Sequence, residues 1–573
     1  MAHNTHSAAV AHIIREGGAT LGIELGSTRI KAVLIDENHA PIASGNFDWE
    51  NRLEGGLWTY SLDDVWAGLR HSFAELSRDV EDQYGVTLKK LRGFGVSGMM
   101  HGYLAFDGEG ELLTPFRTWR NTNTEKAAAE LSALLGFNIP IRWSASHLYQ
   151  AVLNGEEHLR KVAFVTTLAG YVHWMLTGRK VIGIGDASGM FPIDSGANDF
   201  DAGMVEKFET LMAICGYGEL KIKKIFPEAL IAGEDAGVLT EAGARMMDPG
   251  GALEAGVPMC PPEGDGPTGM VATNSVAAMT GNISAGTSIF AMAVLDKPLT
   301  RIYPEIDMIT TPDGKPVAMV HCNNCTSDLD AWVRIFAESN ALFGVAADKN
   351  ALYEVLYNAA LAGDPDCGGI LSYNYVSGEP ITGFEHGRPL MARTPDARFT
   401  LANFMRSMLF ATMAGLKIGM DIIVEKENIR LAQLTGHGGL FKTKGVGQRL
   451  MAAALSVPIA VMESAGEGGA WGMAILAAYG AHCERDQETG IRDQGTGCRD
   501  QESGIREQRT LFVRGAHSSD VESLADYLQS KVFKDDAGAL IAPDAADVDG
   551  FAKYMDRYTK GLPIEKAAVE NLF

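Results

Sequence analysis

The sequence predicts an α/β protein of two lobes with related topology, each a mixed sheet covered by helices. Three apolar β-rich runs, an amphipathic helix and a further strand follow one another between residues 19 and 99. The tight turn Gly26-Ser27-Thr28 has a counterpart at Gly286-Thr287-Ser288. After residue 430, strands alternate with glycine loops and helices, the order that nucleotide-binding sites use.

The first lobe is predicted to span residues 19–275. The runs 21–25 and 30–35 flank the first hairpin, and a third run follows it. Apolar residues then recur at steps of three and four from Val65 to Tyr84, which indicates an amphipathic helix. Ser61 and Asp64 predict its capping box, and the strand 91–99 follows. Residues 1–18 are expected to form a loose leader.

The second lobe is predicted to span residues 276–573. We expect a long helix over 401–425, a strand at 431–434, a glycine loop at 435–439 and a helix over 445–455, then a strand at 458–462 and a helix over 468–480. Residues 485–511 contain four approximate copies of a seven-residue polar unit without an apolar stripe. This segment is therefore expected to be a flexible insertion, with closing helices over 521–533 and 548–562.

Composition excludes several classes of function. The chain has 49 Lys and Arg against 72 Asp and Glu, a net charge of −23, which disfavours nucleic acid and anionic membranes as partners. Backbone N–H groups can still bind phosphate. No apolar run reaches the ~18–20 residues of a spanning helix, and no secretion signal is recognisable. Seven cysteines fit a reducing compartment, so we expect a cytoplasmic protein.

Two acidic motifs carry the chemistry of the first lobe. In Glu24-Leu25-Gly26-Ser27-Thr28-Arg29-Ile30-Lys31, hydroxyl and N–H groups can point at phosphate, and the carboxylate of Glu24 can hold Mg²⁺. In Gly264-Asp265-Gly266, a carboxylate between glycines can approach a substrate and take a proton from an attacking hydroxyl. Each segment also reads as an ordinary turn, so neither is specific alone.

The remaining motifs are individually weak. The turn Gly286-Thr287-Ser288 and the loop with Gly436, Gly438 and Gly439 permit close approach of a nucleotide, or simply tight packing. His101, after a strand, is suited either to a hydroxylated ligand or to an ordinary loop. Cys322-x-x-Cys325 has no second pair at zinc-site spacing, so neither metal nor redox function is favoured.

The order of these pieces resembles the FGGY family of carbohydrate kinases over about residues 19–480. The family's first hairpin reads D-x-G-T-[ST]-x-x-[KR]; here Glu24 stands for the Asp and Ser27 for the Thr. The resemblance implies a two-lobed actin-like, ribonuclease H-like fold with a ligand cleft between the lobes. It also implies that ATP and Mg²⁺ are used, that Asp265 is the catalytic base, and that Glu24 and Asp265 face the metal.

The resemblance further implies residues for the two ligands. The residues that would bind ATP and its phosphates are Ser27, Thr28, Lys31, Gly286, Thr287, Ser288, Gly436, Gly438 and Gly439. The residues that would bind the sugar are Met100, His101, Gly102, Trp119, Asn121 and Asp265.

The implied substrate is a small ketopentose. Ketopentose kinases such as xylulokinase carry G-Q-M-H-G and W-x-D; here Met99 replaces the Gln and Asn121 the Asp. D-xylulose and L-ribulose are the leading substrates, and these departures favour L-ribulose. The alternatives are an ATPase of the same superfamily that acts on a protein partner, and a catalytically silent sugar-binding protein. A homodimer is left open.

Overall fold

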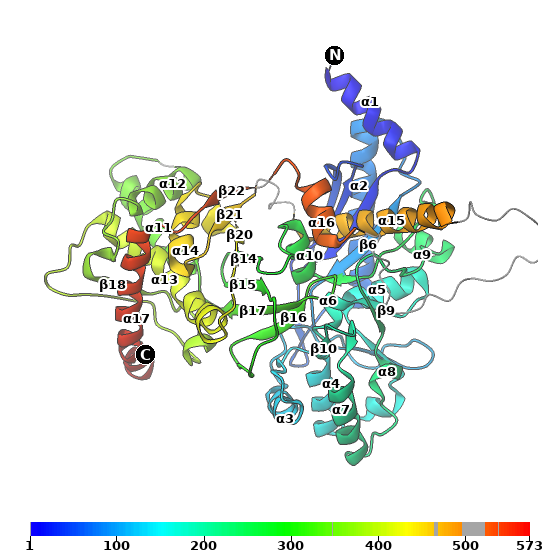
Figure 1. Cartoon of the computed structure of the whole chain (residues 1–573), viewed down its shortest axis with the longest axis horizontal. Helices are drawn as coiled ribbons and strands as arrows, with labels where there is room; N and C mark the ends of the chain where they lie inside the picture. Colours follow the sequence, from blue (N-terminus) through cyan, green and yellow to red (C-terminus); the bar gives the residue numbers. More distant parts are fainter. Residues whose placement is uncertain (1, 347, 463–467, 495–521, 537, 573) are drawn as a thin grey trace, which may run out of the picture. The chain divides into compact units, whose positions relative to one another are not determined.

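The computed structural model describes residues 2–346, 348–462, 468–494, 522–536 and 538–572. They divide into two compact units (Figure 1). Unit 1 comprises residues 1–272, 309–315 and 467–534, and unit 2 comprises 273–308, 316–466 and 535–573. Each unit is described by itself.

The main sheet of unit 1 has the strand order β3-β2-β1-β6-β13 over the described residues. Strands β1 (Thr20–Leu25), β2 (Arg29–Ile35) and β3 (Pro41–Asp48) form an antiparallel meander. Strand β6 (Gly93–Gly98) pairs in parallel with β1, and β13 (Glu263–Gly264) pairs in parallel with β6. The carboxyl ends of these three parallel strands therefore lie at one edge of the sheet. Glu24 is near the end of β1, and Asp265 directly follows β13.

The sheet of unit 2 repeats this topology. Within the described part of the chain its order is β16-β17-β15-β14-β20-β21-β22. Strands β14, β15 and β17 form the antiparallel meander, and β20 and β21 add to β14 in parallel. The order of three antiparallel and two parallel strands thus occurs in both units, which confirms the expectation of two lobes with related topology.

The elements of unit 1 alternate short strands with helices. The further strands are β4 (Arg52–Glu54), β5 (Leu57–Thr59), β7 (Leu104–Phe106), β8 (Phe164–Thr166), β9 (Val181–Gly183), β10 (Ile193–Asp194), β11 (Asp199–Phe200) and β12 (Glu228–Leu230). The helices are α1 (Ala2–Arg15), α2 (Leu62–Tyr84), α3 (Glu125–Leu135), α4 (Ser144–Asn154), α5 (Leu168–Thr177), α6 (Ile184–Ala187), α7 (Ala202–Ile214), α8 (Ile222–Ile225), α9 (Glu241–Met247), α10 (Asp265–Ala272), α15 (Gly469–Gln494) and α16 (Leu524–Tyr527).

In unit 2, helices α13, α14 and α17 gather beside the strands (Figure 1). The strands are β14 (Gly281–Ala285), β15 (Ile289–Val294), β16 (Asp307–Thr310), β17 (Pro316–Cys322), β18 (Ile370–Tyr373), β19 (Leu390–Arg393), β20 (Leu434–His437), β21 (Ile459–Val461) and β22 (Ala539–Ile541). The helices are α11 (Ser327–Leu342), α12 (Lys349–Ala360), α13 (Leu401–Asp421), α14 (Val446–Leu455) and α17 (Ala545–Asn571).

The two units differ from the two consecutive segments that the sequence predicts. The first segment of unit 1 ends at Ala272, close to the expected boundary at 275, but residues 309–315 and 467–534 also belong to this unit. Helix α15 packs on β1 and β6 and on α10. The physical reason is the glycine at position 22 of β1. A Cβ on Gly22 would lie 2.2 Å from the carbonyl oxygen of Ala470 in α15, so the absence of a side chain lets the helix rest directly on the strand.

The expected loose leader is instead the helix α1. Val10, Ala11 and Ile14 are buried in the same hydrophobic core as Val80 of α2. Burial of this apolar face stabilises the helix, which local sequence alone did not indicate. Of the two hydrogen bonds in the predicted capping box of α2, one is formed: Ser61 Oγ accepts from the N–H of Asp64 at 3.0 Å. The Asp64 carboxylate instead pairs with Arg52 at 2.9 Å.

One helical stretch of unit 2, Leu401–Lys426, is long and apolar enough to cross a membrane, which corrects the expectation that no segment qualifies. It is the only such stretch among the described residues. Most of it is buried in the core of unit 2, and Arg406 within it forms a buried ion pair with Asp547. These features are those of a core helix, whose charged residues interrupt the apolar sequence.

The segment predicted as an insertion begins inside a helix. Helix α15 continues to Gln494, so it includes the start of the repeat segment 485–511. Residues 495–511 lie outside the described residues. The closing helices belong to different units: α16 follows in unit 1, and α17 lies in unit 2.

Candidate active site

The turn between β1 and β2 presents its N–H and hydroxyl groups as donors. Its carbonyl oxygens are already occupied: Trp49 Nε1 donates to Gly26 at 2.7 Å, and the Tyr60 hydroxyl donates to Ser27 at 2.5 Å. The N–H of Trp49 donates to the carbonyl of Thr28 at 3.1 Å. The rings of Trp49 and Tyr60 stack, so the turn is held from one side. The N–H and hydroxyl groups of Ser27 and Thr28 remain as the donors a phosphate would use.

Glu24 lies at the end of β1, directly opposite Lys31 of β2. The pKa of Glu24 is raised to about 7, first by burial and then by the charge of Asp265, whereas the N–H of Ala470 and the charge of Lys31 act in the lowering direction. Ala470 is in the first turn of α15, whose N-terminus favours negative charge. Glu24 is therefore a carboxylate held between a helix N-terminus and a lysine.

Asp265 is the first residue of α10 and follows the short strand β13. Its Oδ1 accepts hydrogen bonds from the N–H of Met100 at 3.2 Å and from its neighbour Gly266 at 3.0 Å. Burial raises the pKa of Asp265, while these N–H groups lower it. The structure thus brings Asp265 together with Met100 and Glu24, as the sequence predicts.

Two further carboxylates, Asp186 and Glu263, surround Asp265 and were missed by the sequence analysis. Burial, followed by the charge of a neighbouring carboxylate, raises the pKa of each to about 8; for Asp186 the neighbour is Asp265, and for Glu263 it is Asp186. The Thr167 hydroxyl donates to Asp186 Oδ2 at 2.6 Å, whereas Asp186 Oδ1 is buried without a hydrogen-bond partner among the described residues. The single available signal was Glu263 itself, an acidic residue beside Gly264-Asp265-Gly266.

Replacing Asp186 by Asn is expected to change how stability depends on pH. The pKa of Asp186 is raised from 3.8 to about 8 in the folded protein. Its contribution to stability is therefore fully present below about pH 4 and lost as the pH rises towards 8. Because Asn cannot ionise, the free energy of unfolding of the variant should rise relative to that of the wild type as the pH increases through this window. The expected change is about 1.4 kcal/mol for each pH unit within the window. Urea unfolding of both proteins at pH 5 and pH 8 measures the gain.

The matched control for this prediction is Asp235→Asn, which removes an exposed carboxylate in the same unit. Its stability relative to the wild type should change little between the two pH values, because an exposed charge stays solvated. An equal gap between Asp186→Asn and wild type at pH 5 and pH 8 would contradict the prediction.

The segment after β6 supplies the residues expected to contact a sugar. His101 is buried with a positive φ of 71°, and its Nδ1 lies 3.3 Å from the carbonyl oxygen of Gly189. Burial, and then the charge of Arg142, lowers the pKa of His101, so the ring is neutral. Gly102 has φ +90°, and a Cβ there would lie 2.7 Å from a backbone oxygen, so glycine is required. This tight turn follows directly from Met100, which binds Asp265.

Trp119 and Asn121 differ in whether their side chains are free to contact a ligand. Trp119 is 40% exposed. Asn121 is buried, and its side chain pairs with the backbone of Trp58, with Oδ1 accepting from N at 2.9 Å and Nδ2 donating to O at 2.8 Å. Nδ2 also donates to the carbonyl of Thr118 at 3.0 Å. Asn121 therefore ties its loop to β5, and both of its amide hydrogens are already used.

The corresponding turn of unit 2, Gly286-Thr287-Ser288, is held in the same manner as the first. Its carbonyl oxygens accept from the loop after β17: Cys325 N donates to Thr287 at 2.9 Å, and Thr326 N and Oγ1 donate to Gly286 at 3.1 and 2.9 Å. Cys322 and Cys325 are buried free thiols, and burial raises the pKa of both. The cysteine pair thus borders the turn as part of its support.

The glycine loop starts later than predicted, because Thr435, Gly436 and His437 lie in strand β20. Gly438 follows with φ +97°, and a Cβ there would lie 2.4 Å from the carbonyl oxygen of Ala285. Strand β20 and the end of β14 therefore approach closely at Gly438. Gly439 then begins a short 3₁₀ turn before α14.

Glu24 and Asp265 are suited to a divalent cation. Both are half-buried carboxylates, and the charge of Asp265 raises the pKa of Glu24, which a cation would offset. Mg²⁺ typically takes one or two carboxylates and completes its shell with water and phosphate oxygens. In the described part of the chain no group of three or more His, Cys, Asp or Glu is placed to hold a metal.

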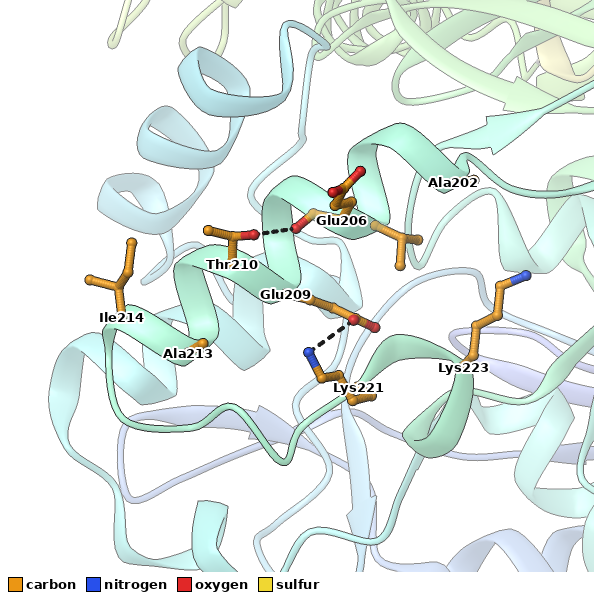
Figure 2. A pocket seen from close by; sticks show the side chains of 9 residues that line it. Ala202, Glu206, Glu209, Thr210, Ala213, Ile214, Lys221 and Lys223 are labelled. Atoms are coloured by element: carbon orange, nitrogen blue, oxygen red, sulfur yellow. Dashed lines mark hydrogen bonds and ion pairs between the residues drawn. The ribbon is translucent and has the colours of Figure 1, made fainter.

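A hollow of about 620 Å³ lies away from these residues, on α7 and α8 (Figure 2). It is lined by Ala202, Val205, Glu206, Glu209, Thr210, Ala213, Ile214, Lys221 and Lys223. Lys221 pairs with Glu209 at 3.1 Å, and Lys223 pairs with Asp199 at 3.1 Å. Both lysines of the hollow are thus paired with carboxylates, and its lining contains none of the predicted site residues.

Solved structures and curated proteins resemble this chain over most of its length. A xylulose kinase of Haemophilus influenzae is 20% identical over 471 residues, 80% of this chain and 90% of the relative. A gluconate kinase from Lactobacillus acidophilus has a TM-score of 0.71 at 15% identity, covering 96% of this chain and 98% of that chain. A ligand-bound xylulose kinase from the same organism has a TM-score of 0.70 at 15% identity, covering 96% and 99%. These structures show the actin-like two-lobed fold.

Family models settle the membership. The N-terminal domain model of the FGGY family of carbohydrate kinases matches residues 19–271, and the C-terminal domain model matches residues 281–481. The first model contains β1, β13 and Asp265, and the second contains both Gly286 and Gly438. The chain therefore belongs to the FGGY family of carbohydrate kinases.

Proposed function

We propose that this chain transfers the γ-phosphate of ATP to the terminal hydroxyl of a ketopentose. The observation that carries the proposal is Asp265, a half-buried carboxylate at the start of α10 that accepts a hydrogen bond from the N–H of Met100 and lies near Glu24. Its raised pKa makes it a better proton acceptor than an ordinary Asp, which suits a general base working near neutral pH.

In unit 1, Asp265 accepts the proton of the attacking hydroxyl, and the tight turn at Met100, His101 and Gly102 orients the sugar. The neutral His101 ring serves as a hydrogen-bonding group, not as a cation. Trp119, partly exposed, offers an aromatic face to the ligand. Asn121 supports the loop that carries Trp119 through its bonds to Trp58.

The two turns hold phosphate oxygens. Ser27 and Thr28 in unit 1, and Thr287 and Ser288 in unit 2, supply N–H and hydroxyl donors, Gly286 closes its turn by donating its own N–H to the Ser288 carbonyl at 2.9 Å, and Lys31 adds positive charge. The glycines of the β20 loop allow the nucleotide to approach the backbone. Mg²⁺, held by Glu24 and Asp265, would neutralise charge on the phosphate oxygens. Positioning and charge stabilisation supply most of the rate in phosphoryl transfer.

D-xylulose is the first substrate to test. Relatives that are 18–24% identical to this chain are named xylulose kinases. The preference for L-ribulose rested partly on Asn121, but its amide hydrogens are used within the protein, so this position says little about the sugar. Both sugars therefore remain in the proposal, with D-xylulose first.

The alternative of an ATPase that acts on a protein partner is not favoured. Both domain models that match the chain describe carbohydrate kinases. A silent sugar-binding protein would not require the acidic pair of Glu24 and Asp265, with its cost of burial.

The test is ADP release by the purified protein with Mg-ATP across D-xylulose, L-ribulose, D-ribulose, L-xylulose, gluconate and glycerol. We expect one ketopentose to raise the rate at least about tenfold above background, because its bound hydroxyl competes with water as the acceptor. A flat response with steady hydrolysis would contradict the proposal and favour the ATPase. Tight sugar binding without turnover would favour the silent binder.

A further inference from the structure

A buried carboxylate in unit 2, Glu379, binds the loop that follows β17. Its Oε1 accepts from the N–H of Asn323 at 3.3 Å, and its Oε2 accepts from the N–H and the side-chain amide of Asn324 at 3.1 and 3.0 Å. The N–H of Ile381 also bonds to this carboxylate. Glu379 is 1% exposed, so these four donors take the place of water around its charge.

The side chains of the same loop bind back to the segment that carries Glu379. Asn323 Nδ2 donates to the carbonyl of Gly378 at 2.9 Å. Asn324 Oδ1 accepts from the N–H and the hydroxyl of Ser377, at 3.0 and 3.1 Å. The two segments are therefore joined by bonds in both directions, and the conformation of the loop depends on the carboxylate at their centre.

The next two residues of this loop support the second phosphate turn. The N–H of Cys325 donates to Thr287, and both the N–H and the hydroxyl of Thr326 donate to Gly286, as described above. Glu379 is thus connected to the turn through its hydrogen bonds to Asn324, the peptide chain from Asn324 to Thr326, and the hydrogen bonds of Cys325 and Thr326. A shift of the loop would change the carbonyl directions in the turn, and with them the directions of its N–H groups.

We propose that Glu379 is a positioning residue for nucleotide phosphates, acting through residues 323–326 on the turn Gly286-Thr287-Ser288. This inference rests on the proposed function in one respect, the binding of nucleotide phosphates by that turn. Glu379 itself does not touch the nucleotide. A glutamine would fit the same space, but its amide N–H₂ would replace one acceptor oxygen and face donors of the loop.

A matched control separates positioning from general stability. Glu427 is also a buried carboxylate of unit 2, 3% exposed. It accepts from the N–H and hydroxyl of Thr300, each at 2.8 Å, and from the Tyr303 hydroxyl at 2.6 Å. These partners lie outside the loop 323–326. Glu427→Gln therefore removes a comparable carboxylate without disturbing the support of the turn.

The experiment measures binding by calorimetry without sugar, using the Mg²⁺ complex of the β,γ-imido analogue of ATP, and AMP as a second probe. For Glu379→Gln we expect the dissociation constant of the analogue to rise about tenfold or more, because a charged buried hydrogen-bond network is broken. AMP, which lacks the terminal phosphates, should bind as it does to the wild type. Glu427→Gln should leave both constants unchanged.

A second variant, Thr326→Val, keeps Glu379 and removes only the hydroxyl bond to Gly286, so it tests the path if Glu379→Gln does not fold. It should weaken analogue binding about threefold to tenfold and leave AMP unaffected. Where both variants fold, the double variant should lose less than the product of the single losses, because the residues share one path.

The outcomes separate this inference from the proposed function. Weaker analogue binding in Glu379→Gln but not in Glu427→Gln supports the inference even if no sugar is phosphorylated. Equal analogue binding in Glu379→Gln, Glu427→Gln and wild type overturns it, even if a ketopentose is turned over. Failure of the wild type to bind the analogue overturns the inference together with the nucleotide part of the proposed function.

Discussion

Asp265→Asn is expected to lower turnover by about 10²–10⁴-fold, the usual effect of removing a general base. Asn has nearly the same shape and still accepts the hydrogen bond from Met100 through its oxygen. The variant should therefore fold and bind the sugar with nearly unchanged affinity. The measurements are kcat with Mg-ATP and the ketopentose that gives the highest rate of ADP release, and the dissociation constant of that sugar by calorimetry.

The exposed Asp235→Asn variant serves as the control for this prediction and should keep wild-type turnover. Turnover of Asp265→Asn within about threefold of wild type would remove Asp265 from the role of base, since general-base catalysis contributes far more. Loss of sugar binding along with turnover would instead assign Asp265 chiefly to holding the ligand.

Gly22→Ala is expected to destabilise unit 1 by about 3 kcal/mol, at the upper end of overpacking effects. The added Cβ would lie 2.2 Å from the carbonyl oxygen of Ala470 and 2.3 Å from the nitrogen of Ala474. Both are backbone atoms of α15, so the helix must move away from β1. Because the N–H of Ala470 bonds to Glu24, turnover should fall as well.

Urea unfolding followed by tryptophan fluorescence measures this effect, and Gly108→Ala is the matched control. A Cβ on Gly108 meets nothing within 4 Å, and its φ is not positive, so the control should unfold within about 0.5 kcal/mol of wild type. Equal midpoints for Gly22→Ala and Gly108→Ala would show that α15 does not rest on β1 as described.

Local sequence patterns predicted the features that depend on neighbouring residues. The meander, the helix beginning after Ser61 and the two phosphate turns all follow from periodicity and turn residues within a few positions of one another. The recurrence of the turn at Gly286 also predicted that the second lobe would repeat the first. The same patterns placed Asp265 between glycines, next to a strand end.

Contacts between distant segments decided the rest. Whether α1 forms depends on the apolar face of α2, and the assignment of α15 to unit 1 depends on the absence of a Cβ at Gly22. The role of Asn121 was equally hidden, because its partner Trp58 lies 63 residues away.

The sequence by itself therefore indicated the first meander, the two Gly-Ser-Thr and Gly-Thr-Ser turns and the candidate base, since each depends on residues close together along the chain. Only the tertiary structure decided which acidic groups surround that base and which residues support the turns. Asp186 lies 77 positions before Glu263, and Glu379 lies 55 positions after Asn324. Burial and hydrogen bonding between such residues arise when the chain folds, and no local periodicity encodes them.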